Sequence, residues 1–178
     1  LLGAFHVVQP AWPHMKSSGY GRVVLTSSSS TFGHQANSNY AAAKAGVLGL
    51  TTALAGEGAS FGISVNAVLP YAVSSIATDN PLLGSDNAAI RSALDALTPR
   101  RNPESVAPLV VYLGSSECAV NGQAFSALAG RYARTFPAVA DGWMSVDPEP
   151  TPEVIAQNMV LIGDTTSFMV PESMLDEI

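Results

Sequence analysis

Charged residues and cysteine are scarce in this chain. Only 12% of the 178 residues are charged, and eight Lys and Arg against 14 Asp and Glu leave a formal net charge of −6. A nucleic-acid partner requires a basic surface, so this balance argues against one. The single cysteine, Cys118, cannot form an internal disulfide and is typical of a packed thiol. The three histidines lack metal-ligand spacing to a third donor, so we expect no metal site.

Long apolar runs are lacking too. No run reaches the roughly 18 residues that a membrane helix needs, and the N-terminus has no signal-peptide pattern. We therefore expect a cytoplasmic protein that does not associate with membranes. The hydrophobic fraction is nevertheless 47%, enough for one domain with a substantial core. So much apolar sequence with so little charge suggests that some surface is covered in an oligomer.

The charge is unevenly distributed. Every Lys and Arg lies at or before Arg134, whereas eight acidic residues follow it. This shift in composition predicts a main body over residues 1–130 and an acidic C-terminal extension over residues 131–178.

Apolar, polar and turn-forming segments predict alternating helices and strands. A helix is predicted from Leu1 to beyond Met15, with Gly19 as its end. Strands are predicted at residues 21–26 and 63–69, the second of them ended by Pro70. Further helices are predicted at about residues 39–60, after Asn102-Pro103-Glu104 and after Thr151-Pro152-Glu153.

Tyr40 and Lys44 form the first candidate catalytic pair. They are four residues apart in an Ala-rich segment, so on a helix they share one face. An ammonium one turn away favours the phenolate form of a tyrosine, and a bound nicotinamide cation would favour it further, which yields a general base. A hydroxyl from Ser27–Ser30 would then hold the substrate oxygen during hydride transfer. Taken alone, this spacing more often belongs to ordinary helix-surface residues.

The segments, in their order, resemble the short-chain dehydrogenase/reductase family. The family pattern is a strand ending in serine, a YxxxK helix and a strand carrying N-A-x-x-P. These appear here at residues 21–28, at residues 40–44 and at residues 62–70, which include Asn66-Ala67-Val68-Leu69-Pro70. Residues 122–126, which follow an Asn-Gly turn, resemble the family's last strand. The resemblance implies an α/β fold with a doubly wound parallel sheet of the Rossmann type. It also implies an NAD- or NADP-dependent oxidoreductase that interconverts a small-molecule secondary alcohol and a ketone.

The same resemblance assigns catalytic roles. Tyr40 is the expected general acid/base, Lys44 supports it and holds the cofactor's ribose, and Ser28 orients the reacting oxygen. Strand alternation places Ser28 on the same face as Thr26, and its neighbours Ser27 and Ser29 are the alternatives.

Nicotinamide contacts are also implied by position. Pro70, Val73 and Ser75 correspond to residues that bind this part of the cofactor in the family. Tyr71 stands where the family usually has a glycine, so the backbone beside the nicotinamide is expected to differ.

A phosphate-binding glycine turn is missing from the sequence. Gly19-Tyr20-Gly21 lies between a helix and a strand, the reverse of the order that a dinucleotide fold requires, and it lacks a third glycine. We therefore expect the C-terminal part of such a domain, with the nucleotide-binding half absent. On its own, such a piece would be inactive and would not bind the cofactor tightly. The alternative is a catalytically silent fragment that serves only as a folded oligomerisation module.

Residues beyond Gly130 resemble the (3R)-hydroxyacyl-CoA dehydrogenase subgroup, including its terminal helix. This resemblance implies an acyl-CoA as a possible substrate. Residues 80–97 would then cover the substrate, and four arginines could contact coenzyme A phosphates: Arg100, Arg101, Arg131 and Arg134. Solvated arginines, or partners for the acidic extension, are the alternative interpretation of these four residues.

Small residues along the predicted helix at residues 39–60 permit close helix packing. In the family, the equivalent helix pairs with its copy in a neighbouring subunit, which implies a homodimer or homotetramer. Packing on the chain's own sheet is the other use of such residues.

Overall fold

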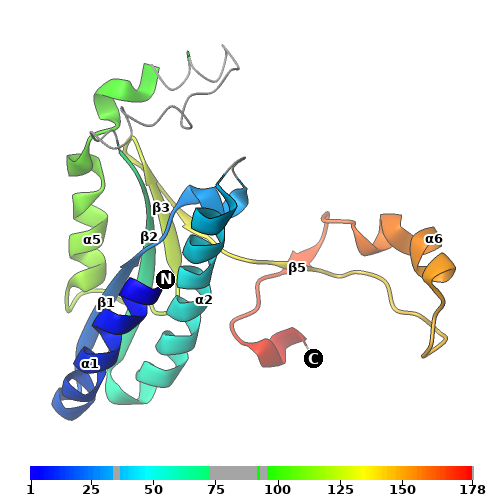
Figure 1. Cartoon of the computed structure of the whole chain (residues 1–178), viewed down its shortest axis with the longest axis horizontal. Helices are drawn as coiled ribbons and strands as arrows, with labels where there is room; N and C mark the ends of the chain where they lie inside the picture. Colours follow the sequence, from blue (N-terminus) through cyan, green and yellow to red (C-terminus); the bar gives the residue numbers. More distant parts are fainter. Residues whose placement is uncertain (34–36, 73–91, 93–95, 178) are drawn as a thin grey trace. The chain divides into compact units, whose positions relative to one another are not determined.

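The computed structural model describes residues 1–33, 37–72, 92 and 96–177. The chain forms two compact units, Leu1–Thr135 and Phe136–Ile178, which are treated separately below (Figure 1). The second unit starts five residues beyond the predicted boundary at residue 130, because a strand at Arg131–Thr135 belongs to the first unit's sheet.

The first unit is an α/β structure, as predicted. Its helices and strands, in chain order, are α1 (Leu2–Ser18), β1 (Gly21–Thr26), α2 (Ser38–Gly58), β2 (Ile63–Tyr71), α5 (Ala107–Gly114), β3 (Ala124–Leu128) and β4 (Arg131–Thr135). Short 3-10 turns are η1 (Ser29–Phe32), η2 (Ala59–Phe61), η4 (Thr98–Arg100) and η5 (Pro103–Ser105). Each helix and strand predicted for the described part of this unit is present, whereas β4 was not predicted. The predicted substrate cover at residues 80–97 lies mostly outside the described residues.

The sheet has the strand order β1-β2-β3-β4. The first three strands run parallel, in a register that pairs Thr26 with Val68 and Val68 with Phe125, and β4 returns antiparallel to β3. The ends of β1, β2 and β3, at Thr26, Tyr71 and Leu128, therefore lie along one side of the sheet, which we call the carboxyl edge.

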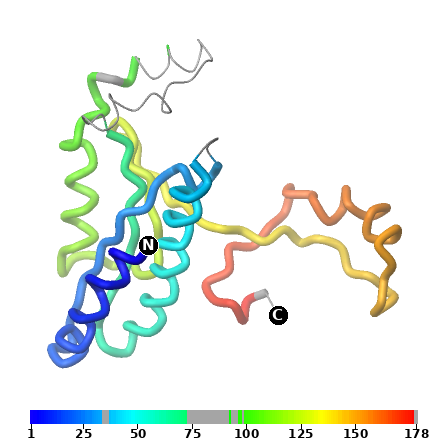
Figure 2. Tube along the Cα trace, in the orientation of Figure 1, coloured from blue at the N-terminus to red at the C-terminus, as the bar shows by residue number. Residues whose placement is uncertain are grey.

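Helices cover both faces of this sheet (Figures 1 and 2). Alternate residues of β2, from Ile63 to Leu69, are buried in one core cluster with Val8 of α1 and Val47 of α2. On the other face, Val68 packs with Ala127, Val106 and Leu109 beside α5. A strand buried on both faces reads as a nearly continuous apolar run, which is why the sequence indicated β2 clearly.

Three predicted boundaries were wrong. The strand expected at residues 122–126 is β3 at Ala124–Leu128, because Gly122 is left-handed (φ 71°) and belongs to the turn before the strand. β2 does not end at Pro70 but continues through it to Tyr71, since a proline at the end of a strand loses only one ladder hydrogen bond. The helix predicted after Asn102 is interrupted at Val106, with η5 before it and α5 after it.

Two asparagines, Asn66 in β2 and Asn121 before β3, fasten the sheet to neighbouring segments. Asn66 is fully buried, and its amide donates to the Val120 carbonyl (2.9 Å) and accepts from the Gln123 N–H (3.1 Å). Asn121 accepts from the Val65 N–H (2.8 Å) and donates to the Ala55 carbonyl (3.1 Å). We call Asn66 and Asn121 the asparagine clamp, because together they join β2, α2 and the approach to β3.

The turns around β1 require glycine. α1 ends at Gly19 in the left-handed conformation (φ 64°), as predicted. Gly62 is also left-handed (φ 69°), and a Cβ there would collide with the Gly19 carbonyl oxygen. This close approach aligns the starts of β1 and β2.

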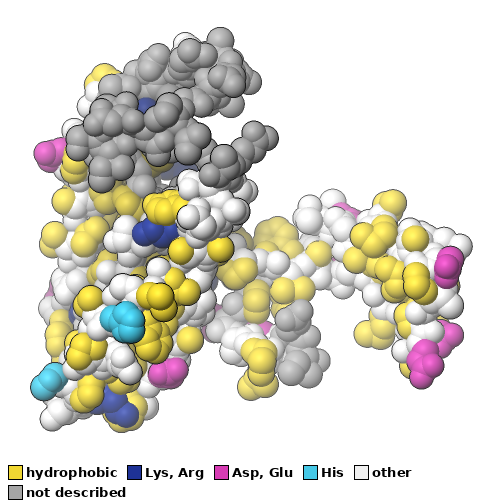
Figure 3. Space-filling model, in the orientation of Figure 1, with side chains coloured by type: hydrophobic (Ala, Val, Ile, Leu, Met, Phe, Trp, Pro, Cys, Tyr) yellow, Lys and Arg dark blue, Asp and Glu magenta, His cyan; other side chains and the backbone are white. Residues whose placement is uncertain are grey.

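The second unit contains α6 (Pro152–Ile162), as predicted, and a short antiparallel pair, β5 (Val139–Ala140) and β6 (Phe168–Met169), that was not. None of its described residues is buried in this single chain. Met144, Val146 and Val160 are 85% exposed or more, and apolar side chains are visible on its surface (Figure 3). Across the described residues of the chain, no helix has the length and hydropathy to span a membrane.

Candidate active site at the carboxyl edge

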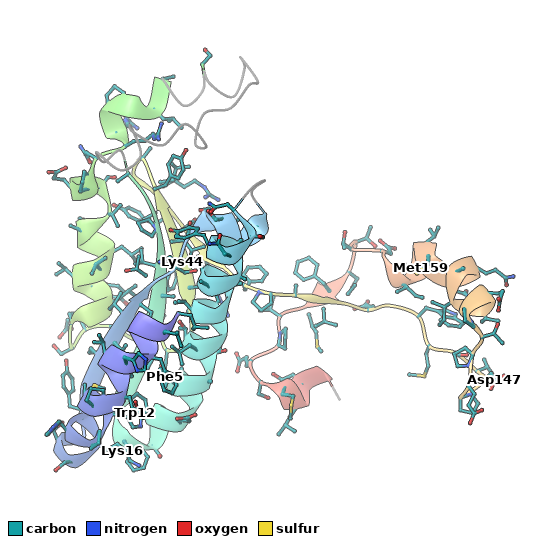
Figure 4. All side chains as sticks on the ribbon, in the orientation of Figure 1. Phe5, Trp12, Lys16, Lys44, Asp147 and Met159 are labelled. Atoms are coloured by element: carbon teal, nitrogen blue, oxygen red, sulfur yellow. The ribbon has the colours of Figure 1, made fainter. Side chains whose placement is uncertain are left out.

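Lys44 joins α2 to the end of β1. Its Nζ donates a hydrogen bond to the Thr26 carbonyl oxygen at 2.8 Å, and its side chain is half-buried. Figure 4 labels Lys44 on α2. The ammonium is thus held at the carboxyl edge, where ligands bind in open α/β sheets. One hydrogen bond leaves two N–H donors of the ammonium for other partners.

Tyr40 lies one turn before Lys44 on the same helix. The Lys44 Nζ is 5.5 Å from the centroid of the Tyr40 ring, so the predicted pairing on one helix face is present in the structure. The tyrosine is 42% exposed, so a ligand at the carboxyl edge can reach it. Because α2 begins at Ser38, both residues lie in its first two turns.

The three candidate serines have different environments. Ser27 is 2% exposed and donates from Oγ to the Lys44 carbonyl at 2.8 Å, so its hydroxyl connects β1 to α2. Ser28 is half-buried, donates from Oγ to the Ser30 Oγ (3.2 Å) and accepts from the Ser30 N–H (3.2 Å). These contacts give Ser27 a structural role and leave Ser28, or Ser29 next to it, as the serine available to a substrate.

Ser28 is placed by the turn that follows it. It caps η1, and its carbonyl accepts from Thr31 Oγ1 at 3.0 Å. η1 packs against α2, so the serine turn and the helix that carries Tyr40 are neighbours. The alternation of β1 could have distinguished Ser27 from Ser28, since Ser27 continues the buried face of Leu25.

A hollow of about 600 Å³ extends from Lys44 and Thr26 along β1 and α1. Apart from these two residues and Arg22, its described lining is apolar or glycine, including Val7, Val8 and Val23, and it does not include Tyr40 or Ser28. Strand β1 borders the hollow and, within the described residues, pairs only with β2. Leu2 and Val7 of α1 are more than 70% exposed beside it.

The arrangement fits one end of a nicotinamide dinucleotide. The Lys44 ammonium and the Tyr40 hydroxyl can bind ribose hydroxyls at a sheet edge with an adjoining hollow. The sequence contains no G-x-G-x-x-G pattern of the kind that holds a pyrophosphate. Of the predicted nicotinamide contacts, Pro70 lies in β2 at the carboxyl edge, whereas Val73 and Ser75 lie outside the described residues.

Tyr71 occupies the family's glycine position at the end of β2. The Arg101 guanidinium stacks over its ring, 4.6 Å from the centroid. This contact brings the segment before η5 to the carboxyl edge, which the sequence did not indicate. As for metals, the described residues contain no group of three His, Cys, Asp or Glu side chains suited to hold an ion.

Comparison with known proteins defines a class. The profile of the short chain dehydrogenase family matches residues 1–82. With the mixed α/β sheet and with relatives over nearly the whole chain, this match shows that the chain belongs to the short-chain dehydrogenase/reductase family. The predicted family resemblance is therefore confirmed.

Particular enzymes of this family are similar over most of the chain. A short-chain type dehydrogenase/reductase of Mycobacterium tuberculosis is 38% identical over 175 residues, 96% of this chain and 55% of that protein. An acetoacetyl-CoA reductase of Rhizobium meliloti is 38% identical over 136 residues, 74% of this chain and 55% of that enzyme.

A solved structure extends the similarity to both units. Full-length peroxisomal multifunctional enzyme type 2 from Drosophila melanogaster aligns with a TM-score of 0.82 and 28% identity, over 99% of this chain and 31% of that one. The structural similarity confirms the predicted fold class, a partial Rossmann-type α/β domain with a C-terminal extension. The chain spans about half the length, or less, of these proteins.

Proposed function

We propose that this short-chain oxidoreductase uses NAD or NADP to interconvert a secondary alcohol and a ketone. The observation that carries the proposal is the Tyr40–Lys44 pair, anchored by the Lys44 bond to the Thr26 carbonyl at the carboxyl edge. If Tyr40 and Lys44 were ordinary helix-surface residues, Lys44 would be expected to point into solvent and not to bind the end of β1. Here the anchor holds the ammonium one turn from a reachable phenol.

In the proposed reaction, the nicotinamide supplies the hydride chemistry and this chain's residues handle the proton. Tyr40 removes the hydroxyl proton of the alcohol at its Oη, or returns it to the carbonyl oxygen in the reverse direction. Lys44 stabilises negative charge on that phenol and holds the ribose. Ser28 donates to the reacting oxygen, after exchanging its present bond to Ser30.

We also propose that the nucleotide-binding half lies on polypeptide outside these 178 residues. The one-sided pairing of β1, the apolar hollow beside it and the exposed apolar residues of α1 support this, because a further parallel strand and helix would cover all three. The greater length of the similar proteins agrees with it. Alone, this chain would then bind the cofactor weakly and be inactive.

For the substrate, we propose a 3-hydroxyacyl-CoA or the corresponding ketone. The name of the acetoacetyl-CoA reductase, a relative with 38% identity, supports an acyl-CoA thioester. A cytoplasmic location is likewise proposed, from the sequence.

A homodimer or homotetramer assembled through α2 is proposed as well. Ala42, Ala45, Gly49, Ala53 and Gly56 are all exposed in the single chain, and their spacing places them along one side of the helix. A Cβ at Gly49 would meet nothing within 4 Å, so Gly49→Leu should fit the isolated subunit yet prevent close helix approach. Light scattering should show oligomers for the wild type and monomers for this variant; a monomeric wild type would refute the proposal.

The function is tested with a polypeptide that joins this chain to an upstream nucleotide-binding half. Its melting temperature should rise with NAD or NADP, because a ligand that binds the native state stabilises it. The 178-residue chain should show little or no shift. Acetoacetyl-CoA with the reduced cofactor, and 3-hydroxybutyryl-CoA with the oxidised one, should then be turned over. A longer polypeptide that binds the cofactor but reduces no ketone would instead support the silent oligomerisation module.

A further inference from the structure

The hairpin between β3 and β4 ends at the carboxyl edge. Its two turn residues, Ala129 (φ 50°) and Gly130 (φ 85°), are both left-handed, as a two-residue turn between twisted strands requires. Alanine adopts this conformation only at a cost, whereas glycine does so freely. The turn is therefore tight, and it presents its backbone to the neighbouring segment.

A second hollow, of about 300 Å³, lies between this turn and the segment Pro99–Ser105. Arg100, Asn102 and Ser105 supply its polar side chains, and Ala129 and Gly130 supply the opposite wall. The Tyr132 hydroxyl donates to the Ser105 carbonyl at 2.7 Å and holds the two walls together. Asn102 uses its Oδ1 to accept the Ser105 N–H (2.9 Å), so its amide N–H₂ is the end left to face a ligand.

Positive charge is concentrated around this hollow in an otherwise acidic chain. Of eight Lys and Arg residues, four lie on the segments that form or adjoin it: Arg100, Arg101, Arg131 and Arg134. Glu104 is the one acidic residue in the two segments Pro99–Ser105 and 128–135, and it is exposed. Arg100 is the one of these four that lines the hollow. An arginine beside amide donors in a concave site is suited to bind phosphate.

The hollow lies along the carboxyl edge from the candidate active site, at a distance that the strand pairing defines. Leu128 pairs with Tyr71 at the end of β2, and Tyr71 is stacked by Arg101, one residue from Arg100. Two strand spacings of about 4.8 Å and three residues of about 3.3 Å place Leu128 roughly 14 Å from Thr26 along the sheet. A small ligand cannot reach both Tyr40 and the hollow over this distance. A reacting group at Tyr40 and an anionic group at the hollow therefore belong either to one long ligand or to two separate ligands.

We propose that this hollow binds the phosphates of the coenzyme A handle of an acyl thioester, with Arg100 as the main cation. The proposal rests on the acyl-CoA substrate proposed above, and it gives a ligand to Arg100, the arginine that lines the hollow. A pantetheine arm is long and flexible, so it can join the phosphates at the hollow to a thioester at the candidate active site. Arg100 is then a specificity residue, since it touches the handle and not the reacting atoms.

Direct binding to the 178-residue chain tests this without any catalysis. Calorimetric titration with coenzyme A should give a dissociation constant at least tenfold lower than titration with pantetheine, which lacks the phosphates. Inorganic pyrophosphate and NADH should both bind more weakly than coenzyme A. In amide NMR spectra, Ser105 and Gly130 should shift on addition of coenzyme A.

Variants locate the site. Arg100→Gln should weaken coenzyme A binding about tenfold and leave pantetheine unaffected, and Arg100→Lys should restore part of the affinity. Lys16→Gln removes the same charge from the end of α1, beside the opposite edge of the sheet, and should change neither value. Melting temperatures of all variants should match the wild type, because Arg100 is exposed.

Three results would overturn the proposal. Equal affinity for coenzyme A and pantetheine would remove the phosphates from recognition. Pyrophosphate or NADH binding as tightly as coenzyme A would indicate a general anion site or a cofactor site. An equal loss of affinity in Arg100→Gln and Lys16→Gln would reflect net charge alone. If coenzyme A binds here but the longer polypeptide reduces no ketone, only the proposed reaction fails.

Discussion

Two polar regions of the first unit differ in what their side chains bind. In the asparagine clamp, Asn66 and Asn121 direct donors and acceptors to backbone groups of other segments, and Asn66 is completely buried. At the carboxyl edge, Tyr40 is reachable and Lys44 makes one bond to Thr26. Both regions involve the same sheet, because Asn66 lies within β2 and Lys44 binds the end of β1 at Thr26.

The difference separates polar residues that maintain the fold from those available to a ligand. A buried amide with satisfied partners costs stability when it is removed, because its partners then lose their hydrogen bonds. Removing a half-exposed hydroxyl or ammonium costs the free protein little stability, because water can replace its hydrogen bonds. Substitutions in the clamp should therefore change stability, and substitutions at the edge should change turnover.

The largest effect is expected from Tyr40→Phe in the longer polypeptide that includes a nucleotide-binding half. Turnover should fall about 1,000-fold or more, because the general acid/base is removed, while the affinity for the cofactor stays within a factor of about three. Steady-state kinetics and fluorescence titration of the reduced cofactor measure the two quantities. Retained activity would exclude Tyr40 from proton transfer.

Ser27, Ser28 and Ser29 allow the same contrast between stability and turnover to be tested in three consecutive residues. Ser28→Ala should lower turnover about 100-fold, since a donor to the developing oxyanion is lost, and should leave the melting temperature nearly unchanged. Ser27→Ala should do the reverse, costing about 1 kcal/mol of stability through the bond to the Lys44 carbonyl. Ser29→Ala is the control. If Ser29→Ala, and not Ser28→Ala, abolishes turnover, Ser29 is the substrate-binding serine.

Asn66→Leu should destabilise the 178-residue chain by about 2 kcal/mol or more. The change leaves the Val120 carbonyl and the Gln123 N–H without their side-chain partner in a buried site. Urea unfolding followed by circular dichroism measures the loss. Gln157→Leu in α6 also replaces a side-chain amide, but an exposed one, so this matched control should change stability little. Equal losses in both variants would contradict a specific role for the clamp.

The smallest effect concerns Asp176, whose carboxylate accepts the N–H groups of Ser173 and Glu172. These bonds hold its pKa below the ordinary value. Because the pKa of Asp176 is lowered, its carboxylate stabilises the turn at residues 172–176 at pH values above the unfolded-state pKa of about 3.9. This stabilisation is lost as the pH falls through the lower, folded value. The amide shifts of Ser173 should follow that titration, and Asp176→Asn should remove the dependence.

The sequence predicted most of the sheet and its helices, because β1 and β2 are apolar runs and α2 has a clear composition. It did not predict β4, whose sequence Arg-Tyr-Ala-Arg-Thr has little apolar character and becomes a strand only by pairing with β3. The two-residue strands β5 and β6 are too short to leave any periodic pattern. The boundary between the two units also depended on the pairing of β4 with β3, which places residues 131–135 in the first unit.

At the candidate site, the four-residue spacing was enough to place Tyr40 and Lys44 on one side of α2. It could not show that Lys44 binds the Thr26 carbonyl, since every residue has a backbone carbonyl and the sequence does not mark which one is the acceptor. Strand alternation favoured Ser28 over Ser27, but the sequence could not show that the Ser27 hydroxyl binds the Lys44 carbonyl of α2. The Tyr71–Arg101 stack joins residues 30 positions apart and was equally invisible.

By itself, then, the order of residues determined the family, the α/β layout and the pairing of a phenol with an amine, because these depend on local spacing and hydrophobic pattern. Tertiary structure alone decided which polar groups are consumed by the fold and which stay accessible. That division depends on contacts between segments distant in the chain, such as Ser27 with Lys44 and Asn66 with Val120.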